Sequence, residues 1–155
     1  MGGLVTTFGS KIFDGNVAAE DAPAVARLRA AGVVVLGKVN TTEFALSSPS
    51  TLHGASINPW DASRTAGGSS NGSGTAASAG LCSFAIGTDT AGSGRVPAGF
   101  NNIVGLKPSK GLISAYGVVP AAQSVDCVSI FARSVGLAAQ VLAQVITVPP
   151  RCIRT

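Results

Sequence analysis

Residues 65–100 read TAGGSSNGSGTAASAGLCSFAIGTDTAGSGRVPAGF, a stretch rich in serine and glycine. It carries only two charged residues, Asp89 and Arg95. A flexible Gly/Ser linker needs no large apolar residues, yet Leu, Phe, Ile and Val occur here in short blocks. These blocks predict a strand and a helix that hold a glycine-rich loop in place.

The periodicity outside this stretch predicts further helices and strands. Residues 20–31 (EDAPAVARLRAA) form an amphipathic pattern with Pro23 in the first turn and Gly32 as a stop. The apolar run at 33–36 predicts a strand that is buried on both faces. We expect the remaining elements to be a small-residue helix at 73–81 with Ser73 as its N-cap, strands at 83–88, 103–106 and 117–119, and an amphipathic helix at 134–146.

The alternation of these elements predicts the α/β class, with a mixed β-sheet flanked by helices. The length of 155 residues suits one domain, which we expect to span residues 1–147. Residues 148–155 contain two prolines and no apolar period, so they are expected to form an irregular tail.

Composition argues against several classes of function. The net charge is +4, but the Lys and Arg residues are scattered and aromatic residues make up only 5%, so no nucleic-acid partner is expected. No apolar run approaches the ~18 residues that a membrane-spanning helix needs. His53 is the only histidine, and we expect neither a metal nor a cofactor. Three cysteines without paired spacing indicate a reducing, cytoplasmic location.

The charged residues make up only 12% of the chain, about half the usual share. Many buried Ala and Gly residues would produce this balance, and so would a piece of a larger protein, which lacks its full share of surface. The sequence leaves both explanations open.

Three known glycine-rich motifs do not fit residues 65–100. A phosphate-binding P-loop needs Lys after its last Gly, and here Gly74 is followed by Thr75. A dinucleotide-binding loop follows a strand, whereas a Pro/Ser/Arg loop precedes Gly72. A nucleophile elbow needs GxSxG, which none of these serines has.

Longer motifs resemble the amidase signature family over roughly residues 3–145. They are GGSSNGSGTAASAG and IGTDTAGSGRVPAGFNNIVGLKPSKG, with DAPAVARLRAAGVVVLGKVNTTEFA upstream and YGVVP downstream. Within the family, the second motif is most similar to allophanate hydrolases and the related domain of urea amidolyase. The resemblance implies hydrolysis of allophanate or a similar small amide by a Ser-cisSer-Lys triad.

Matching motif to motif, the resemblance implies Ser93 as the nucleophile and Ser69 as the bridging serine after a cis peptide bond. Backbone amides of Thr90, Ala91 and Gly92 would form an oxyanion hole. We expect the supporting residues to be Ser70 as a hydrogen-bonding neighbour, Gly68 for backbone freedom, and Asp89 and Arg95 as a buried pair that stiffens the loop.

The family's lysine motif precedes the LxTTxGS segment, which here begins at Leu4, almost at Met1. Lys11 and Lys38 occupy other family positions. Two hypotheses therefore stand beside hydrolysis: the chain is an inactive or complementing piece, or it binds a small amide or carboxylate without turnover. The expected partner is a small-molecule amide, and association with a second copy or a complementing chain stays open.

Overall fold

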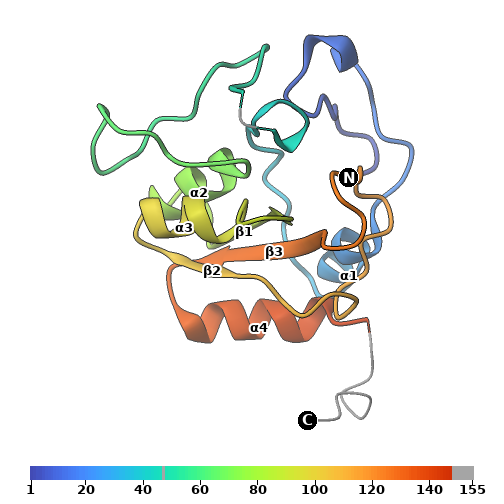
Figure 1. Cartoon of the computed structure of the whole chain (residues 1–155). Helices are drawn as coiled ribbons and strands as arrows, with labels where there is room; N and C mark the ends of the chain where they lie inside the picture. The colour runs from blue at the N-terminus through green and yellow to red at the C-terminus, as the bar shows by residue number, and fades with distance from the viewer. Residues whose placement is uncertain (47, 148–155) are drawn as a thin grey trace.

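A computed structural model describes residues 1–46 and 48–147 of the chain. Three strands and four α-helices make up its regular part (Figure 1). In chain order they are α1 (Pro23–Ala30), α2 (Asn71–Ser78), β1 (Phe84–Asp89), α3 (Arg95–Phe100), β2 (Val104–Leu106), β3 (Cys127–Ala132) and α4 (Val135–Val145). Two short 3₁₀ turns, Lys11–Phe13 and Glu43–Ala45, lie in the N-terminal loops.

The strands form one sheet in the order β1-β3-β2, and both pairs are antiparallel. All six residues of the central strand β3 are buried. Its sequence CVSIFA is a short run without alternation, as expected for a strand covered on both faces.

Helices cover both faces of the sheet (Figure 1). On one face α4 packs against β3 and α1, in a core built around Leu28, Ile130 and Val141. On the other face α2 and α3 pack on the strands through Ala77, Ala98 and Phe131. The predicted α/β class, with a small sheet flanked by helices, is confirmed, but the predicted mixed sheet is wrong for the described residues, because both strand pairs there are antiparallel.

Small residues let α2 lie close to its neighbours. A Cβ atom on Gly72 would stand 2.5 Å from the backbone N and O of Asn40, and one on Gly87 would stand 2.5 Å from Ser70 Oγ. The Ser70 hydroxyl bonds the backbone of Thr88 in β1, and Ser73 Oγ donates to Ile86 O. Ser73 therefore lies inside α2, and its predicted role as N-cap is wrong; Ser70 occupies the N-cap position.

Gly72 and Gly99 offer a matched pair of helix substitutions. Gly72→Ala is expected to lower the free energy of unfolding by about 1–3 kcal/mol, because the new methyl group meets backbone that cannot move aside. In α3 a Cβ on Gly99 meets nothing within 4 Å, so Gly99→Ala should raise stability by up to about 1 kcal/mol. Urea denaturation followed by circular dichroism measures both, and equal stabilities would contradict the packing argument.

Further details of the sequence-based prediction differ from the structure. Residues 33–36 pair with no strand among the described residues, and the side chains of Val34 and Leu36 are 79% and 74% exposed. Residues 117–119 also form no strand. Conversely, β3 and α3 were not predicted. An apolar run favours an extended backbone, but a strand also needs a neighbour to accept its hydrogen bonds.

The structure describes no helix that combines the length and apolar character required to cross a membrane. The predicted tail, 148–155, lies outside the described residues. The helix predicted at 134–146 is confirmed as α4, and Ser134 caps it by accepting a hydrogen bond from the Leu137 amide.

Candidate active site

The loop that carries Ser69 runs from Thr65 to Ser70 and enters α2. Gly67 has a φ of 79°, a region that favours glycine, and the Gly68–Ser69 peptide bond is cis. Ser69 O accepts hydrogen bonds from Thr42 N and from Thr41 Oγ1, both at 3.0 Å. The glycines allow this backbone path, and the 41–42 segment fixes its position.

Buried amide side chains hold the other end of this loop. Asn101 Nδ2 donates to Ala66 O at 2.8 Å, and Asn58 Nδ2 donates to Thr65 O and Phe100 O. The Trp60 indole N–H lies within 2.9 Å of both Ser78 Oγ and Asn101 O. These bonds connect the loop to α2 and α3, so the Ser69 loop is fixed from both sides.

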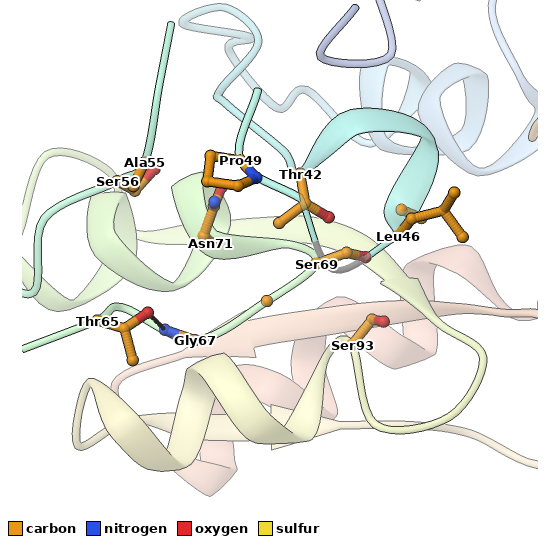
Figure 2. Close-up of a pocket in the computed structure, with 12 residues that line it drawn as sticks. Thr42, Leu46, Pro49, Ala55, Ser56, Thr65, Gly67, Ser69, Asn71 and Ser93 are labelled. Atoms are coloured by element: carbon orange, nitrogen blue, oxygen red, sulfur yellow. Dashed lines mark hydrogen bonds between the residues drawn. The ribbon is translucent and has the colours of Figure 1, made fainter. Parts of the chain in front are cut away.

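A cavity of about 380 Å³ opens beside this loop, and both Ser69 and Ser93 line it (Figure 2). Ser69 comes from the loop before α2, whereas Ser93 comes from the turn between β1 and α3. A backbone hydrogen bond from Ser70 N to Ser93 O at 3.2 Å holds the two segments together. The fold thus brings the two serines singled out in the sequence to one cavity.

Two hydroxyl groups in the wall of this cavity lack hydrogen-bond partners. Thr42 is 7% exposed and Ser69 is 4% exposed. Neither Thr42 Oγ1 nor Ser69 Oγ is hydrogen-bonded to any residue that the structure describes, Ser93 included. Buried polar groups are nearly always paired, so these two hydroxyls, whose oxygen atoms are shielded from solvent, are exceptions in the described part of the chain.

The turn 89–95 presents backbone amides near Ser93. The Gly92 amide donates to Asp89 Oδ1 at 2.8 Å, and the Gly94 and Arg95 amides donate to Asp89 Oδ2. Within the described ranges, the amides of Thr90, Ala91 and Ser93 donate to no protein acceptor. The structure therefore does not support Gly92 as an oxyanion donor, while the amides of Thr90 and Ala91 are free to act as donors.

Asp89 is the anchor of this turn. Its side chain is fully buried, and besides the three amides it bonds Arg95 Nε at 2.9 Å and Nη2 at 3.1 Å. Burial alone would raise the pKa of Asp89, but the hydrogen bonds from Arg95 and Gly92 hold it well below its ordinary value. The carboxylate stays ionised and organises the turn.

In the expected buried pair of Asp89 and Arg95, only Asp89 is buried. The Arg95 side chain is 55% exposed, and Lys107 Nζ provides a second cation at 3.4 Å from Asp89 Oδ1. Lys107 Nζ also donates to Thr90 O at 2.9 Å. Two cations therefore share the carboxylate, and Arg95 is not its sole partner.

Asp126 supports the same turn from the neighbouring segment. It accepts a short hydrogen bond from Thr90 Oγ1 and further bonds from the amides of Ala121 and Ala122. Burial would raise the pKa of Asp126, but the bond from Thr90 and those from the amides lower it. Asp126 thereby fixes the orientation of the Thr90 side chain.

None of the four lysines within residues 1–147 donates to Ser69 Oγ. Lys38 Nζ donates to Thr6 Oγ1 at 2.6 Å, Lys107 Nζ bonds Thr90 O and Asp89, and Lys110 Nζ donates to Gln123 O. Burial lowers the pKa of Lys38, yet its amine belongs to a different cluster.

Sequence reasoning missed three residues of the site: Thr42, Lys107 and Asp126. Lys107 lies in a motif that was noticed only for its resemblance, and Asp126 lies in none of the quoted motifs. Thr42 stands before a 3₁₀ turn whose backbone is irregular at Phe44. No local pattern places any of the three against Ser69 or Asp89. In the described part of the chain, no three His, Cys, Asp or Glu side chains cluster as metal ligands do.

Comparison with known proteins agrees with this geometry. The model of the family described as Amidase matches residues 1–151. The chain is 48% identical over 151 residues to the glutamyl-tRNA(Gln) amidotransferase A subunit of Anaeromyxobacter sp. strain K and 49% identical to that of Symbiobacterium thermophilum. Each alignment covers 96% of this chain and 31% of the relative.

Solved structures agree with the fold. The A subunit of the glutamyl-tRNA(Gln) amidotransferase of Thermotoga maritima superposes with a TM-score of 0.92 at 39% identity, covering 97% of this chain and 34% of that one. The peptide amidase of Stenotrophomonas maltophilia gives a TM-score of 0.91 at 41% identity, covering 97% of this chain and 32% of that one. The chain thus spans about a third of the length of its relatives. Its sequence, its sheet and helix arrangement and the match over residues 1–151 together show that the chain belongs to the amidase family.

Proposed function

We propose that residues 1–147 carry the nucleophile half of an amide-hydrolysing site. In this proposal Ser93 Oγ attacks the carbonyl carbon of an amide, and Ser69 Oγ takes the proton of Ser93 and passes it to a base. The observation that supports it most directly is the shared cavity: the two serines come from different elements, and both line it (Figure 2).

The free amides of Thr90 and Ala91 would stabilise the oxyanion that forms when Ser93 attacks. Such donors act best when they are fixed before the reaction, because then they need no reorganisation. Asp89 and Asp126 supply that rigidity, since they anchor the turn through backbone amides and the Thr90 hydroxyl. In the proposal the two aspartates are therefore positioning residues.

The base of this reaction would come from outside the chain's four lysines, none of which donates to Ser69 Oγ in the described part of the structure. Turnover by the chain alone is therefore expected to be weak or absent. This same observation favours the second candidate function, in which the chain acts only as a complementing or binding piece of an amidase.

The substrate is proposed only as a small amide. Allophanate is favoured by the motif TDTAGSGRVPAGFNNIVGLKPSKG, whereas the relatives named above are a component of an amidotransferase and a peptide amidase. Ammonia release from allophanate, glutamine and a peptide amide, measured with the longest polypeptide that contains this chain, distinguishes these classes.

The proposed nucleophile can be tested without the base. At pH 10, hydroxide replaces the base, so a fluorophosphonate probe should form one adduct with the chain, mapped by mass spectrometry to Ser93. Its rate should rise with pH. An adduct spread evenly over several serines, or none at all, would contradict the proposal and leave the binding role as the better candidate.

A further inference from the structure

The Lys107 side chain reaches the turn 89–95 from a different part of the sheet. Lys107 directly follows β2, which lies across β3 from β1, the strand that leads into the turn (Figure 1). Its Nζ donates to Thr90 O at 2.9 Å and lies 3.4 Å from Asp89 Oδ1. Only 22% of the side chain is exposed, and the buried Pro108 that follows favours an extended backbone at position 107. The fold therefore holds one ammonium group against two successive residues of the turn.

Thr90 O and the Ala91 amide belong to the same peptide group. Resonance couples the two ends of this planar group, so a cation at the carbonyl oxygen draws electron density from the nitrogen and makes the N–H a stronger donor. Ala91 is exposed, and its amide donates to no protein acceptor within residues 1–46 and 48–147. The Lys107 ammonium thus acts on an N–H group that the proposed function assigns to the oxyanion.

The two cations at Asp89 contact different groups. In the part of the chain that the structure describes, the Arg95 guanidinium donates only to the Asp89 carboxylate, through Nε and Nη2. Lys107 also contacts the carboxylate, but its closer contact is the carbonyl oxygen of Thr90. Lys107 is less exposed than Arg95, so solvent screens its charge less. Arg95 therefore compensates the anion, whereas Lys107 also polarises the peptide group of Ala91.

We propose that Lys107 is a positioning residue for the oxyanion: through Thr90 O it orients and polarises the Ala91 N–H. This inference rests on the proposed function and deepens it. When Ser93 attacks, the carbonyl oxygen of the amide gains negative charge, and a more polar N–H stabilises that charge more than it stabilises the neutral carbonyl. Lys107 also offsets the Asp89 carboxylate, whose charge in the same turn opposes a second anion. Its effect should therefore appear mainly in the transition state.

A fluorophosphonate probe tests the inference in the 155-residue chain. During labelling the Ser93 Oγ–P bond forms, the P–F bond breaks and fluoride leaves, hydroxide takes the Ser93 proton, and the phosphoryl oxygen gains charge as the oxyanion does. Lys107→Met keeps an unbranched side chain without the ammonium. It should slow labelling about tenfold or more, up to the ~10²–10³-fold cost of removing a whole oxyanion donor.

Two further variants accompany this measurement. Lys107→Arg keeps a charged donor and should restore the rate to within about threefold of the wild type. Lys11→Met, at an exposed lysine, serves as the control and should leave the rate unchanged. The rates are compared at pH 9, where lysine and arginine side chains are both charged.

NMR separates the polarisation of one peptide group from a general loosening of the turn. The nitrogen shift of an amide responds to a hydrogen bond at the carbonyl oxygen of the same peptide group, so Lys107→Met should move the Ala91 nitrogen signal upfield. The three turn amides that donate to the Asp89 carboxylate should move much less. Shifts of equal size at all four amides would mean that Lys107 only holds the turn together, and would overturn the inference.

Equal labelling rates for Lys107→Met and the wild type also overturn the inference, as does a Lys107→Arg variant that is as slow as Lys107→Met. Where Lys107→Met does not fold, Lys107→Gln takes its place, because it keeps an N–H donor without the charge. It should be labelled more slowly than Lys107→Arg, and an equal rate for these two variants rejects the role of the charge.

Steady-state kinetics provides a second readout in a polypeptide that supplies its own base. Lys107→Met should lower kcat about tenfold or more while the KM changes less than about twofold, since the lost interaction belongs to the transition state. A raised KM at unchanged kcat assigns Lys107 to substrate binding instead and overturns the inference.

These outcomes are separate from those of the proposed function. A Ser93 that is labelled at the same rate in every lysine variant leaves the nucleophile in place and rejects only the role of Lys107. A wild type that is not labelled at Ser93 rejects the proposed function, and it rejects the positioning role of Lys107 as well.

Discussion

Replacement of Ser93 by alanine is expected to abolish covalent capture by a fluorophosphonate and to lower amide hydrolysis by at least about 10⁴-fold, the scale seen when a serine hydrolase loses its nucleophile. The loss is large because the proposed reaction needs the Ser93 hydroxyl as its nucleophile, and the hydroxyls of Ser70 and Ser73 are already bonded to Thr88 and Ile86. Ammonia release by the longest polypeptide that contains the chain, together with mass spectrometry of the labelled protein, measures both effects.

The companion variants separate the roles of the two serines. Ser69→Ala removes the proton relay and should lower turnover by about 10²–10⁴-fold, but Ser93 should still be labelled at pH 10. Ser83→Ala, at an exposed serine just before β1, serves as the control and should change neither quantity. Hydrolysis that survives in Ser93→Ala would remove Ser93 from the mechanism.

Asp89→Asn is expected to be the most destabilising isosteric substitution in the site. The buried carboxylate accepts three backbone amides and two Arg95 N–H groups, and the amide of Asn turns an N–H donor toward some of them. A hydrogen bond to a charged group contributes about 1.5–3 kcal/mol, so losing two gives an expected loss of about 3–6 kcal/mol. Urea denaturation measures the free energy of unfolding.

Asp61→Asn is the matched control, because Asp61 accepts comparable local bonds from Ser63 and Arg64 in an exposed turn. The substitution should change the free energy of unfolding little.

Arg95→Ala should destabilise less than Asp89→Asn. Its side chain is half exposed, and Lys107 with the three amides continues to compensate Asp89. An Arg95→Ala variant as unstable as Asp89→Asn would contradict this, because it would mean that the Asp89–Arg95 pair supplies most of the stability that the Asp89 carboxylate contributes.

Acid titration provides an independent check on Asp89. Its pKa is lower in the folded state than the ordinary value of about 3.9, so its contribution is complete above about pH 4 and is lost as the pH falls below that value. The wild type should therefore lose stability below about pH 4, and Asp89→Asn should lose less over the same range. Parallel pH profiles of the two proteins would contradict this assignment.

Local sequence was sufficient for much of the fold. Short-range preferences of backbone and side chain predicted α1 and α4 from their periodicity, β1 from the apolar residues before Asp89, and α2 from its small residues. It was not sufficient for β3, whose apolar run lies between loops, or for the exposed run 33–36. Whether an apolar segment becomes a strand depends on a hydrogen-bonding neighbour, and that neighbour is distant in the sequence.

For the site, the resemblance to the amidase signature family indicated Ser69, Ser93 and the Asp89 turn, because its motifs could be matched residue by residue to this sequence. Only the tertiary structure brought Ser69 and Ser93 to one cavity, gave the Gly92 amide to Asp89, and added Thr42, Lys107 and Asp126. The physical reason is that hydrogen bonds and burial act through space. Thr42 lies 27 positions before Ser69 in the chain, and only the fold places its amide against Ser69 O.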